Sequence, residues 1–499
     1  MTAAMGLADF ERGLAAQRAG EAERAIAAYR TAVEAAPNLA PAHFNLGQLL
    51  RQRGDVTAAA VAFDAAVRLR PDAAEAWINL GVCREQLGDL DTAAACYHEA
   101  TRLAPQDATA LFNSGNVLRK QGNLAAAVSA FEAAAARLPG AAEIWLNLGN
   151  ARREAGRFDE ALAAFDRADT LKPGQPEVEW NRALAELASG RLADGWRHYD
   201  SRWARLGRPR DGGLPWKEWH GDPVEGARIL VWPEQGLGDE ILFATCVPDL
   251  VALGAEVTLA LDPRLVDLYS RVWPDVRVVP DGAWGPGPFD WQVPLGSLPR
   301  YLRPSRADFR PNWSQLVPDR AQLVAWGERL KVLGPGVRVG INWRSGLRGA
   351  DRRRYYAALQ DWRPIFDVAG VELVNLQYDD CRDELEAMEQ ATGRRVHRWP
   401  AVDLKQDLES VAALTWHLDL VIAAPTAVTS LAGAVGTETW QVDPGNDWTV
   451  FGEERSPWFP AVRLFRKPYG DRSWSGTLND VARALSERVA MTAGARAQA

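Results

Sequence analysis

The sequence predicts an all-α repeat array followed by an α/β region with two lobes, each built on a parallel sheet. Two observations lead to this fold class. In the first two hundred residues, several residue types recur at a spacing of about 34 positions. Beyond residue 226, apolar strand patterns alternate with helical ones, which is typical of parallel sheets covered by helices. The length of 499 residues also exceeds what one hydrophobic core usually serves.

The periodic residues form five registers, each with one kind of side chain. They are Pro37, Pro71, Pro105, Pro139 and Pro173; Gly13, Gly47, Gly81, Gly115 and Gly149; Gly20, Gly54, Gly88, Gly122 and Gly156; Ala32, Ala66, Ala100, Ala134 and Ala168; and Tyr29, Phe63, Tyr97, Phe131 and Phe165. A unit such as "AEAWINLGVCREQLGDLDTAAACYHEATRLAPQD" predicts a helix, a Gly-Asp turn, a second helix and a proline. The small residues allow close helix contact, and the aromatics fill the layer between helices. The pattern is strongly similar to the tetratricopeptide repeat, with five full repeats from about residue 6 to 175.

A degenerate sixth unit, "PEVEWNRALAELASGRLADGWRHYDSRW", closes the predicted stack, with Trp196, Tyr199 and Trp203 at its end. We therefore expect a superhelix over residues 1–203. The segment 204–226 is rich in glycine and proline and predicts a linker.

One further register of the repeats holds the asparagines Asn45, Asn79, Asn113, Asn147 and Asn181. A side-chain amide both donates and accepts hydrogen bonds, so a row of them can hold an extended peptide backbone of any sequence. The alternative is that each amide bonds within its own repeat. The resemblance to protein O-glycosyltransferases that thread acceptors along an asparagine ladder favours a polypeptide ligand.

The second half predicts two groups of strands separated by a polar stretch. Strand patterns cover 227–232, 255–261, 276–280 and 289–295, and then 337–343, 371–378, 418–424 and 437–443. Helices are expected near 319–332 and 477–491. We expect one lobe over 227–316 and another over 317–499, both Rossmann-like.

The stretch "VWPEQGLGDEILFAT" (231–245) leads from a strand through a glycine turn into a helix, which is typical of a nucleotide site. A dinucleotide fingerprint would place a small residue where Ile241 stands, although Asp262 mimics the ribose-binding acid. Asp239 and Glu240 at the helix start would repel a pyrophosphate. A helix start instead keeps a carboxylate ionised and able to accept a proton, and Gly236 and Gly238 would let an acceptor hydroxyl approach. Asp239 as a plain helix cap is the alternative.

The segment "PEQGLGDEILF", together with "VGINWRSG", "VNLQYDD", "DLVIAAPTAVTSLAGAVGTETW" and "SPWFPAVRLF", resembles the GT-B glycosyltransferases of the heptosyltransferase type. It also resembles bacterial enzymes that join this domain to tetratricopeptide repeats. The resemblance implies two facing lobes, an acceptor lobe and a nucleotide-sugar lobe. It makes Asp239 the catalytic base.

The same resemblance implies a set of donor-binding residues in the second lobe. They are Arg344, Ser345, Gly346 and Arg348 for the phosphate, Gln377 and Tyr378 for the base, and Thr426, Ala427, Val428 and Ser430 at a phosphate-binding helix start. Arg344 is expected to make a forked contact to phosphate or carboxylate. The sequence departs from the heptosyltransferase pattern at Pro425, where the family has aspartate, and at Ser430, where it has histidine. This favours a different activated sugar.

Composition excludes several classes of partner and site. The net charge of −8 gives no support for nucleic acid, and no apolar run reaches the ~20 residues of a membrane span. Four scattered cysteines and an N-terminus unlike a signal peptide predict a cytoplasmic protein. The DxD at 89–91 belongs to a repeat turn, and the histidines do not cluster, so no metal or other cofactor is expected.

We therefore expect a glycosyltransferase that modifies a serine or threonine of a polypeptide captured by the repeats. The resemblance implies flagellin as the acceptor and a CMP-activated nonulosonic acid as the donor sugar. One alternative is a scaffold with a transferase-like domain that no longer turns over. A third is an oxidoreductase that binds NAD(H).

Overall fold

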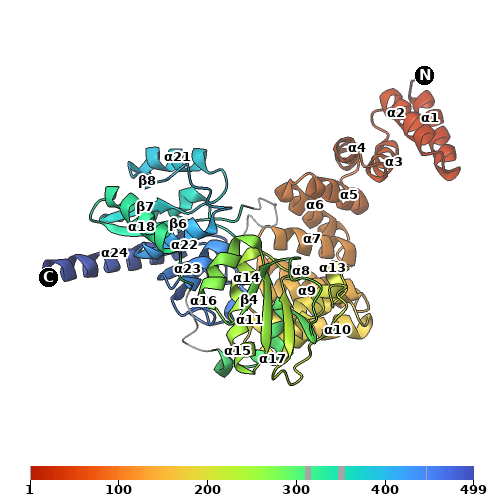
Figure 1. Ribbon diagram of the computed structural model, residues 1–499. Coiled ribbons are helices and arrows are strands. Elements are labelled where there is room, and N and C mark those ends of the chain that lie inside the picture. The colour runs from red at the N-terminus through yellow and green to blue at the C-terminus, as the bar shows by residue number, and fades with distance from the viewer. Residues whose placement is uncertain (1, 310–315, 347–354, 446, 499) are drawn as a thin grey trace. The chain divides into compact units, whose positions relative to one another are not determined.

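The computed structural model describes residues 2–309, 316–346, 355–445 and 447–498 (Figure 1). The chain divides into two compact units, Met1–Pro173 and Gly174–Ala499, called here the N-terminal and C-terminal units. The boundary lies before the degenerate sixth repeat. The expected boundary at residue 203 is therefore corrected, because the helices of that repeat pack with the α/β lobes.

The N-terminal unit is built from consecutive helix pairs, as the period predicts. The helices are α1 (Thr2–Arg18), α2 (Ala22–Ala35), α3 (Ala40–Gln52), α4 (Val56–Leu69), α5 (Ala74–Gln86), α6 (Leu90–Leu103), α7 (Ala108–Lys120), α8 (Leu124–Arg137), α9 (Ala142–Glu154) and α10 (Phe158–Leu171). A Cβ on Gly13 would lie 2.5 Å from the ring of Tyr29, and one on Gly149 would lie 2.4 Å from Phe165. The glycine register therefore exists because an aromatic ring of the next helix occupies the place of a side chain. Gly54, in the turn between α3 and α4, has φ 87°, a conformation that favours glycine.

The C-terminal unit begins with the helices of the sixth repeat, which join the core of the lobes. They are α11 (Pro176–Ala188), α12 (Leu192–Tyr199) and α13 (Arg202–Leu206). The Trp196 ring lies 6.3 Å from Phe243 and 6.2 Å from Trp458, between ring centroids. Trp203 packs on Trp232 at 5.8 Å. These aromatics, expected to seal the end of the stack, instead attach it to both lobes.

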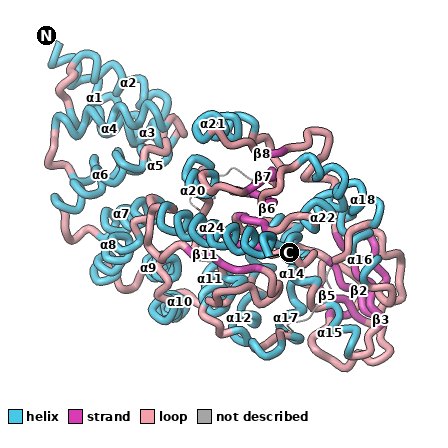
Figure 2. The backbone as a smooth tube through the Cα atoms, turned by 90° about the vertical axis from the view of Figure 1, so that its left-hand side faces the viewer, coloured by secondary structure: helices cyan, strands magenta, loops and turns pink. Residues whose placement is uncertain are grey.

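The first lobe holds a parallel sheet of order β1-β5-β2-β3-β4. Its strands are β1 (Lys217–Glu218), β2 (Arg228–Trp232), β3 (Glu256–Leu261), β4 (Arg277–Pro280) and β5 (Trp291–Pro294), and its helices are α14 (Leu237–Ala244), α15 (Val247–Ala252), α16 (Val266–Val272) and α17 (Leu298–Leu302). In Figure 2, β2, β3 and β5 lie side by side with α15 and α16 beside them. The expected linker at 204–226 is in part an edge strand, because β1 pairs with β5.

The second lobe holds a parallel sheet of order β11-β10-β9-β6-β7-β8. Its strands are β6 (Val337–Asn342), β7 (Val371–Asn375), β8 (Val396–His397), β9 (Leu420–Ala423), β10 (Thr439–Asp443) and β11 (Val462–Arg466), and its helices are α18 (Arg320–Arg329), α20 (Arg363–Phe366), α21 (Arg382–Thr392), α22 (Leu408–Trp416), α23 (Ala427–Ala434) and α24 (Ser475–Gln498). Short 3-10 turns occur in both lobes. The first lobe contains η1 (Pro263–Leu265), η2 (Leu295–Ser297) and η3 (Arg306–Asp308), and the second contains η4 (Leu330–Val332), η5 (Leu359–Trp362) and η6 (Trp448–Val450). Read from β8, this is the 3-2-1-4-5-6 order of doubly wound α/β sheets. The C-terminal unit is therefore an α/β fold with two parallel sheets.

Candidate functional site

Each sheet has a point where the strand order reverses, and ligands of open α/β sheets bind beyond the strand ends there. In the first lobe this point lies between β2 and β5, and in the second it lies between β6 and β9. The glycine loop 233–236 follows β2 and opens α14. The segment 424–426 follows β9 and opens α23. The glycine loop and the segment that contains Thr426 therefore each lie at the strand ends where a ligand is expected.

The start of α14 lies directly against the start of α23. A Cβ built on Gly238 would lie 3.4 Å from the Cα of Ala427 and 3.6 Å from Oγ of Ser430. Asp239, the next residue, is half-buried in the first turn of α14. The structure thus brings the acceptor-loop residues and the helix-start residues of the second lobe together. The side of Gly238 on which a Cβ would lie faces α23. This glycine therefore allows close contact between the two helices there, rather than the approach of an acceptor hydroxyl that the sequence analysis expected.

Thr426 caps α23 as its position predicts. Its Oγ1 accepts a hydrogen bond from the backbone N–H of Val428 at 3.3 Å and donates to Oδ1 of Asn342 at 2.9 Å. The side chain of Val428 is buried in the lobe, so only its backbone amide faces the helix end. Partial positive charge at a helix N-terminus attracts phosphate. The second lobe therefore presents the N-terminal end of α23 next to the start of α14.

Arg344 is already bound to carboxylates of its own chain. Its Nη2 and Nε donate to Glu384 at 2.7 and 3.2 Å, and its Nη1 donates to Asp379. The two acids raise the arginine pKa, against an opposing effect of burial that is the largest single cause. The forked contact expected for a donor phosphate is thus made within the protein. Ser345 beside it is buried, whereas Arg348 and the arginines at 352–354 lie outside the described residues.

Gln377 joins the ends of β6 and β7 and is fully engaged in doing so. Its Oε1 accepts from Nδ2 of Asn342 at 3.0 Å, and its Nε2 donates to the carbonyl of Arg344 at 3.0 Å and to Asp379 at 2.8 Å. It is 2 % exposed. The expected contact of Gln377 with a nucleotide base is therefore replaced by a structural role. Asn342, which the sequence analysis did not single out, connects Gln377 to Thr426; its signal was a polar residue ending a buried apolar strand.

Tyr378 lines a pocket at the carboxyl end of β7. Its hydroxyl accepts from the backbone N–H of Gly346 at 3.0 Å. The pocket, called here the Tyr378 pocket, has a volume of about 270 Å³ and is lined also by Trp326, Asp380, Trp399 and Asp403. Such a mixture of aromatic walls and carboxylates suits a flat ring that carries hydroxyl groups.

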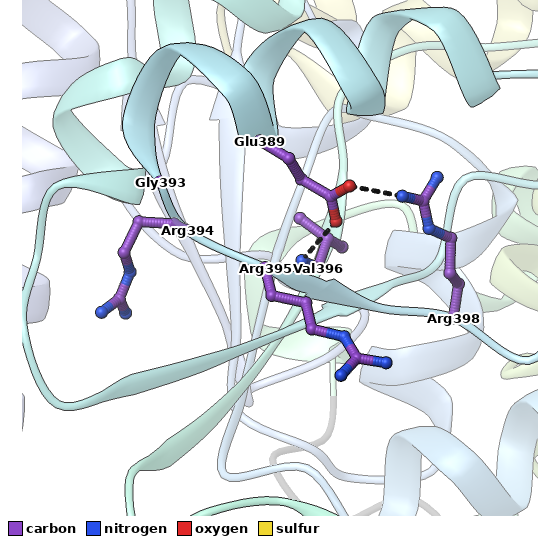
Figure 3. Close-up of a pocket in the computed structure, with 6 residues that line it drawn as sticks. All are labelled: Glu389, Gly393, Arg394, Arg395, Val396 and Arg398. Carbon is purple, nitrogen blue, oxygen red and sulfur yellow. Dashed lines mark hydrogen bonds and ion pairs between the residues drawn. The ribbon is translucent and has the colours of Figure 1, made fainter.

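A second hollow lies along the edge strand β8 (Figure 3). It is lined by Glu389, Gly393, Arg394, Arg395, Val396 and Arg398. Glu389 accepts from Arg398 at 2.5 Å and from the backbone N–H of Val396 at 2.8 Å, and Arg394 donates to the carbonyl of Val371 at 2.7 Å. Val396 begins β8 and Arg398 directly follows it, so the hollow spans the length of this two-residue strand. Arg398 also lines the Tyr378 pocket.

The acids beside Asp239 have structural partners. Oε2 of the buried Glu240 accepts from the backbone N–H of Asp262 at 2.7 Å. Asp262 in turn accepts from Nε and Nη2 of Arg264 at 2.8 and 2.7 Å, and this pairing is the largest cause of its lowered pKa. The carboxylate that mimics a ribose-binding acid is thus paired with Arg264.

The asparagine register makes mostly local hydrogen bonds. The amides of Asn79, Asn147 and Asn181 each donate to the carbonyl four residues earlier at 2.8 to 2.9 Å, and Asn45 donates to the hydroxyl of Tyr29 at 3.2 Å. No such bond of the Asn113 side chain is found in the described part of the chain. Asn181 lies on α11 in the C-terminal unit. The local alternative therefore accounts for the donors, and acceptor binding stays a prediction.

The described residues contain neither a metal centre nor a helix that could span a membrane. No group of three or more histidine, cysteine, aspartate or glutamate side chains is arranged to hold a metal ion there. Within the same ranges, the helices that are long enough to cross a bilayer are not apolar enough to do so.

Comparison with known proteins identifies the repeats. The tetratricopeptide repeat family matches residues 10–68, 44–108, 85–140 and 112–176, so the N-terminal unit contains tetratricopeptide repeats. Protein FlbA of Caulobacter vibrioides is 36% identical over 318 residues, which are 59% of this chain and 52% of the relative. The chain thus spans about half the length of this relative. Because 318 residues exceed the N-terminal unit, the similarity extends into the C-terminal unit.

Solved structures that are similar to part of this chain include MamA and YrrB. The crystal structure of MamA protein is 24% identical, covering 34% of this chain and 92% of that one, with a TM-score of 0.33. The crystal structure of YrrB, described as a TPR protein with an unusual peptide-binding site, is 25% identical and covers 34% of this chain and 88% of that one, also with a TM-score of 0.33.

Proposed function

We propose that the C-terminal unit is a GT-B glycosyltransferase and that the repeats present a polypeptide acceptor to it. The observation that carries the proposal is the approach of Gly238 to Ala427, 3.4 Å from a Cβ position to the Cα. It sets a carboxylate, Asp239, beside a helix start capped by Thr426. Transfer from a nucleotide sugar requires such a pair: a base for the acceptor hydroxyl and a positive end for the leaving phosphate.

In the proposed reaction, Asp239 takes the proton of a serine or threonine hydroxyl as its oxygen bonds to the sugar. The sugar–phosphate bond breaks, and the negative charge of the leaving phosphate is stabilised by the positive N-terminal end of α23, which Thr426 caps. No metal ion takes part. The Tyr378 pocket, at the carboxyl edge of the same sheet, would hold the nucleoside. Arg344 organises Asp379 and Glu384 around that pocket instead of touching the phosphate.

Tetratricopeptide repeats form extended concave surfaces that bind peptides, which supports a polypeptide acceptor. The resemblance of the glycine loop and of "WRSG", "NLQY" and "APTAV" to flagellin-modifying enzymes supports flagellin as that acceptor and a CMP-activated nonulosonic acid as the donor. The altered positions Pro425 and Ser430 support a donor other than a nucleotide-heptose.

A non-catalytic peptide-binding scaffold is the second candidate, and one observation favours it. The arginine expected at the donor phosphate is neutralised by Glu384 and Asp379. A transferase-like domain that had lost its donor would tolerate such pairing.

A melting-temperature panel tests the proposal. The full chain is heated with CMP, UDP, ADP and GDP sugars and with NAD(H). A transferase is expected to be stabilised by one sugar nucleotide, by about 2.7 kcal/mol at a hundred times its Kd. Stabilisation by NAD(H) alone, or by none of these ligands, would contradict it.

A further inference from the structure

The loop that precedes Asp239 is held by side chains from the sixth repeat. Arg202, at the start of α13, is 3 % exposed, and its Nη2 donates to Oε1 of Glu234 at 3.0 Å and to Oγ of Ser297 at 2.7 Å. Glu234 lies in the glycine loop, and its other oxygen accepts from the backbone N–H of Gly296 at 3.3 Å. The pair therefore joins α13 to the carboxyl ends of both β2 and β5.

A second hydrogen bond reaches the same loop from α12. The hydroxyl of Tyr199, a fully buried residue, donates to Oε1 of Gln235 at 3.0 Å. The Arg202 guanidinium lies 4.8 Å from the Tyr199 ring and 4.5 Å from the Trp203 ring, so the three side chains pack as one group. Burial raises the tyrosine pKa above its ordinary value, and the negative charge of Asp239 is among the further causes, which places that carboxylate close by.

The packing of Tyr199 extends to the second lobe. Its ring centroid lies 5.1 Å from that of Trp448, in the turn η6, and 6.5 Å from that of Phe243 on α14. One tyrosine thus contacts η6 of the second lobe, α14 and the loop in front of α14. A rotation of α12 would therefore displace Gln235 and Trp448 together.

We infer that Tyr199 and Arg202 are positioning residues, through which the sixth repeat sets the conformation of residues 234–240 and thereby the position of Asp239. The inference rests on the proposed function for its effect on turnover. Its structural part concerns the loop alone. A loop at a sheet edge has few contacts of its own, and a displacement of about 1 Å at a reacting group can lower a rate a hundredfold.

The test uses three substitutions in the full chain. Tyr199→Phe removes only the hydroxyl and keeps the ring packing, and Arg202→Lys keeps the charge and loses the forked contact. Tyr97→Phe is the matched control, since Tyr97 is a buried tyrosine whose hydroxyl donates to Glu85 at 3.1 Å within the N-terminal unit. Tyr199→Phe remains informative if Arg202→Lys fails to fold.

Hydrogen exchange of the backbone amides of Asp239 and Glu240 reports on the loop, because both donate to the carbonyl of Gly236. Loss of one bond is expected to speed their exchange roughly 2- to 10-fold in Tyr199→Phe. Protection elsewhere in Tyr199→Phe should match the wild type, as should the exchange of Asp239 and Glu240 in Tyr97→Phe. On the same preparations, transfer is expected to show a kcat at least about tenfold lower with the donor KM within about twofold.

Unchanged exchange at Asp239 and Glu240 in a folded Tyr199→Phe protein would overturn the inference, whatever the activity. Faster exchange with a wild-type protein that transfers no sugar would overturn the proposed function and leave the positioning role standing. Faster exchange with undiminished kcat would show that the loop does not position the reacting group, and would also overturn the inference.

Discussion

Gly238 and Ala427 meet so closely that a Cβ on the glycine would lie 3.4 Å from the Cα of the alanine. This distance is ordinary van der Waals contact, so Gly238→Ala is expected to fold with nearly wild-type stability. Gly238→Val adds methyl groups that must displace α23, at a cost of ~1–3 kcal/mol in the free energy of unfolding. Urea denaturation of both variants measures the difference. Equal stability of the two variants would show that the helix starts are not in contact.

Arg344 leads to a prediction about stability rather than donor affinity. Arg344→Met removes the hydrogen bonds that Arg344 donates to Glu384 and Asp379, and hydrogen bonds to charged groups contribute ~1.5–3 kcal/mol. The free energy of unfolding should fall by that amount. Adding Glu384→Gln and Asp379→Asn should recover part of the loss, because two negative charges that faced Arg344 are removed. If Arg344→Met instead unfolds like the wild type but binds nucleotide sugar at least tenfold more weakly, Arg344 contacts the donor.

Glu240 and Asp443 make stability depend on pH. Burial is the main cause that raises the pKa of Glu240 from 4.5 to about 7 and that of Asp443 from 3.8 to about 7. Each folded-state pKa is above the unfolded one, so each contribution is complete below about pH 4 and is lost as the pH rises to about 7.

Glu240→Gln keeps an oxygen that can accept from Asp262 and removes the titration. Between pH 4.5 and 7, the free energy of unfolding of the wild type should therefore fall by roughly 3 kcal/mol more than that of Glu240→Gln. Asp443→Asn should likewise reduce the pH dependence of the free energy of unfolding over this range, and the double variant should reduce it further. Parallel stability curves for wild type and Glu240→Gln would contradict the buried-acid account.

The asparagine register separates acceptor binding from repeat stability. If Asn79, Asn113 and Asn147 hold an acceptor backbone, replacing all three by alanine should weaken acceptor affinity a hundredfold or more, at ~0.5–1.5 kcal/mol for each bond. Donor binding should be unchanged. If they serve only the local bonds seen for Asn79 and Asn147, the variant should melt earlier and bind acceptor normally. Melting and acceptor titration on one preparation separate the two.

The features that follow from local pattern were predictable from the sequence. The 34-residue period is visible because every repeat needs a glycine at the position where an aromatic ring of the next helix packs, as at Gly13 and Tyr29. The strands β2, β3, β6 and β7 carry long apolar runs. In contrast, β1 and β8 span two residues each and carry no readable alternation, and β11 was not expected although it pairs with β10.

The features missed depend on contacts between distant residues. The sequence of α11 and α12 keeps the repeat pattern. However, Trp196 packs on Phe243 and Trp458 of the lobes, so these helices belong to the C-terminal unit. The sequence beside Arg344, which follows β6, gives no sign of Glu384, which lies on the helix α21. A polar residue with satisfied partners, such as Gln377, looks in sequence like a ligand-binding residue.

The central claim is that Asp239 is the base of a sugar transfer, and Asp239→Asn tests it most directly. The substitution keeps the size and shape of the side chain, and it removes proton acceptance. Single-turnover transfer to the acceptor, with the sugar nucleotide that raises the melting temperature, is expected to fall about 100-fold or more. Donor affinity and melting temperature should stay near those of the wild type. Transfer near the wild-type rate by a folded Asp239→Asn protein would contradict the account.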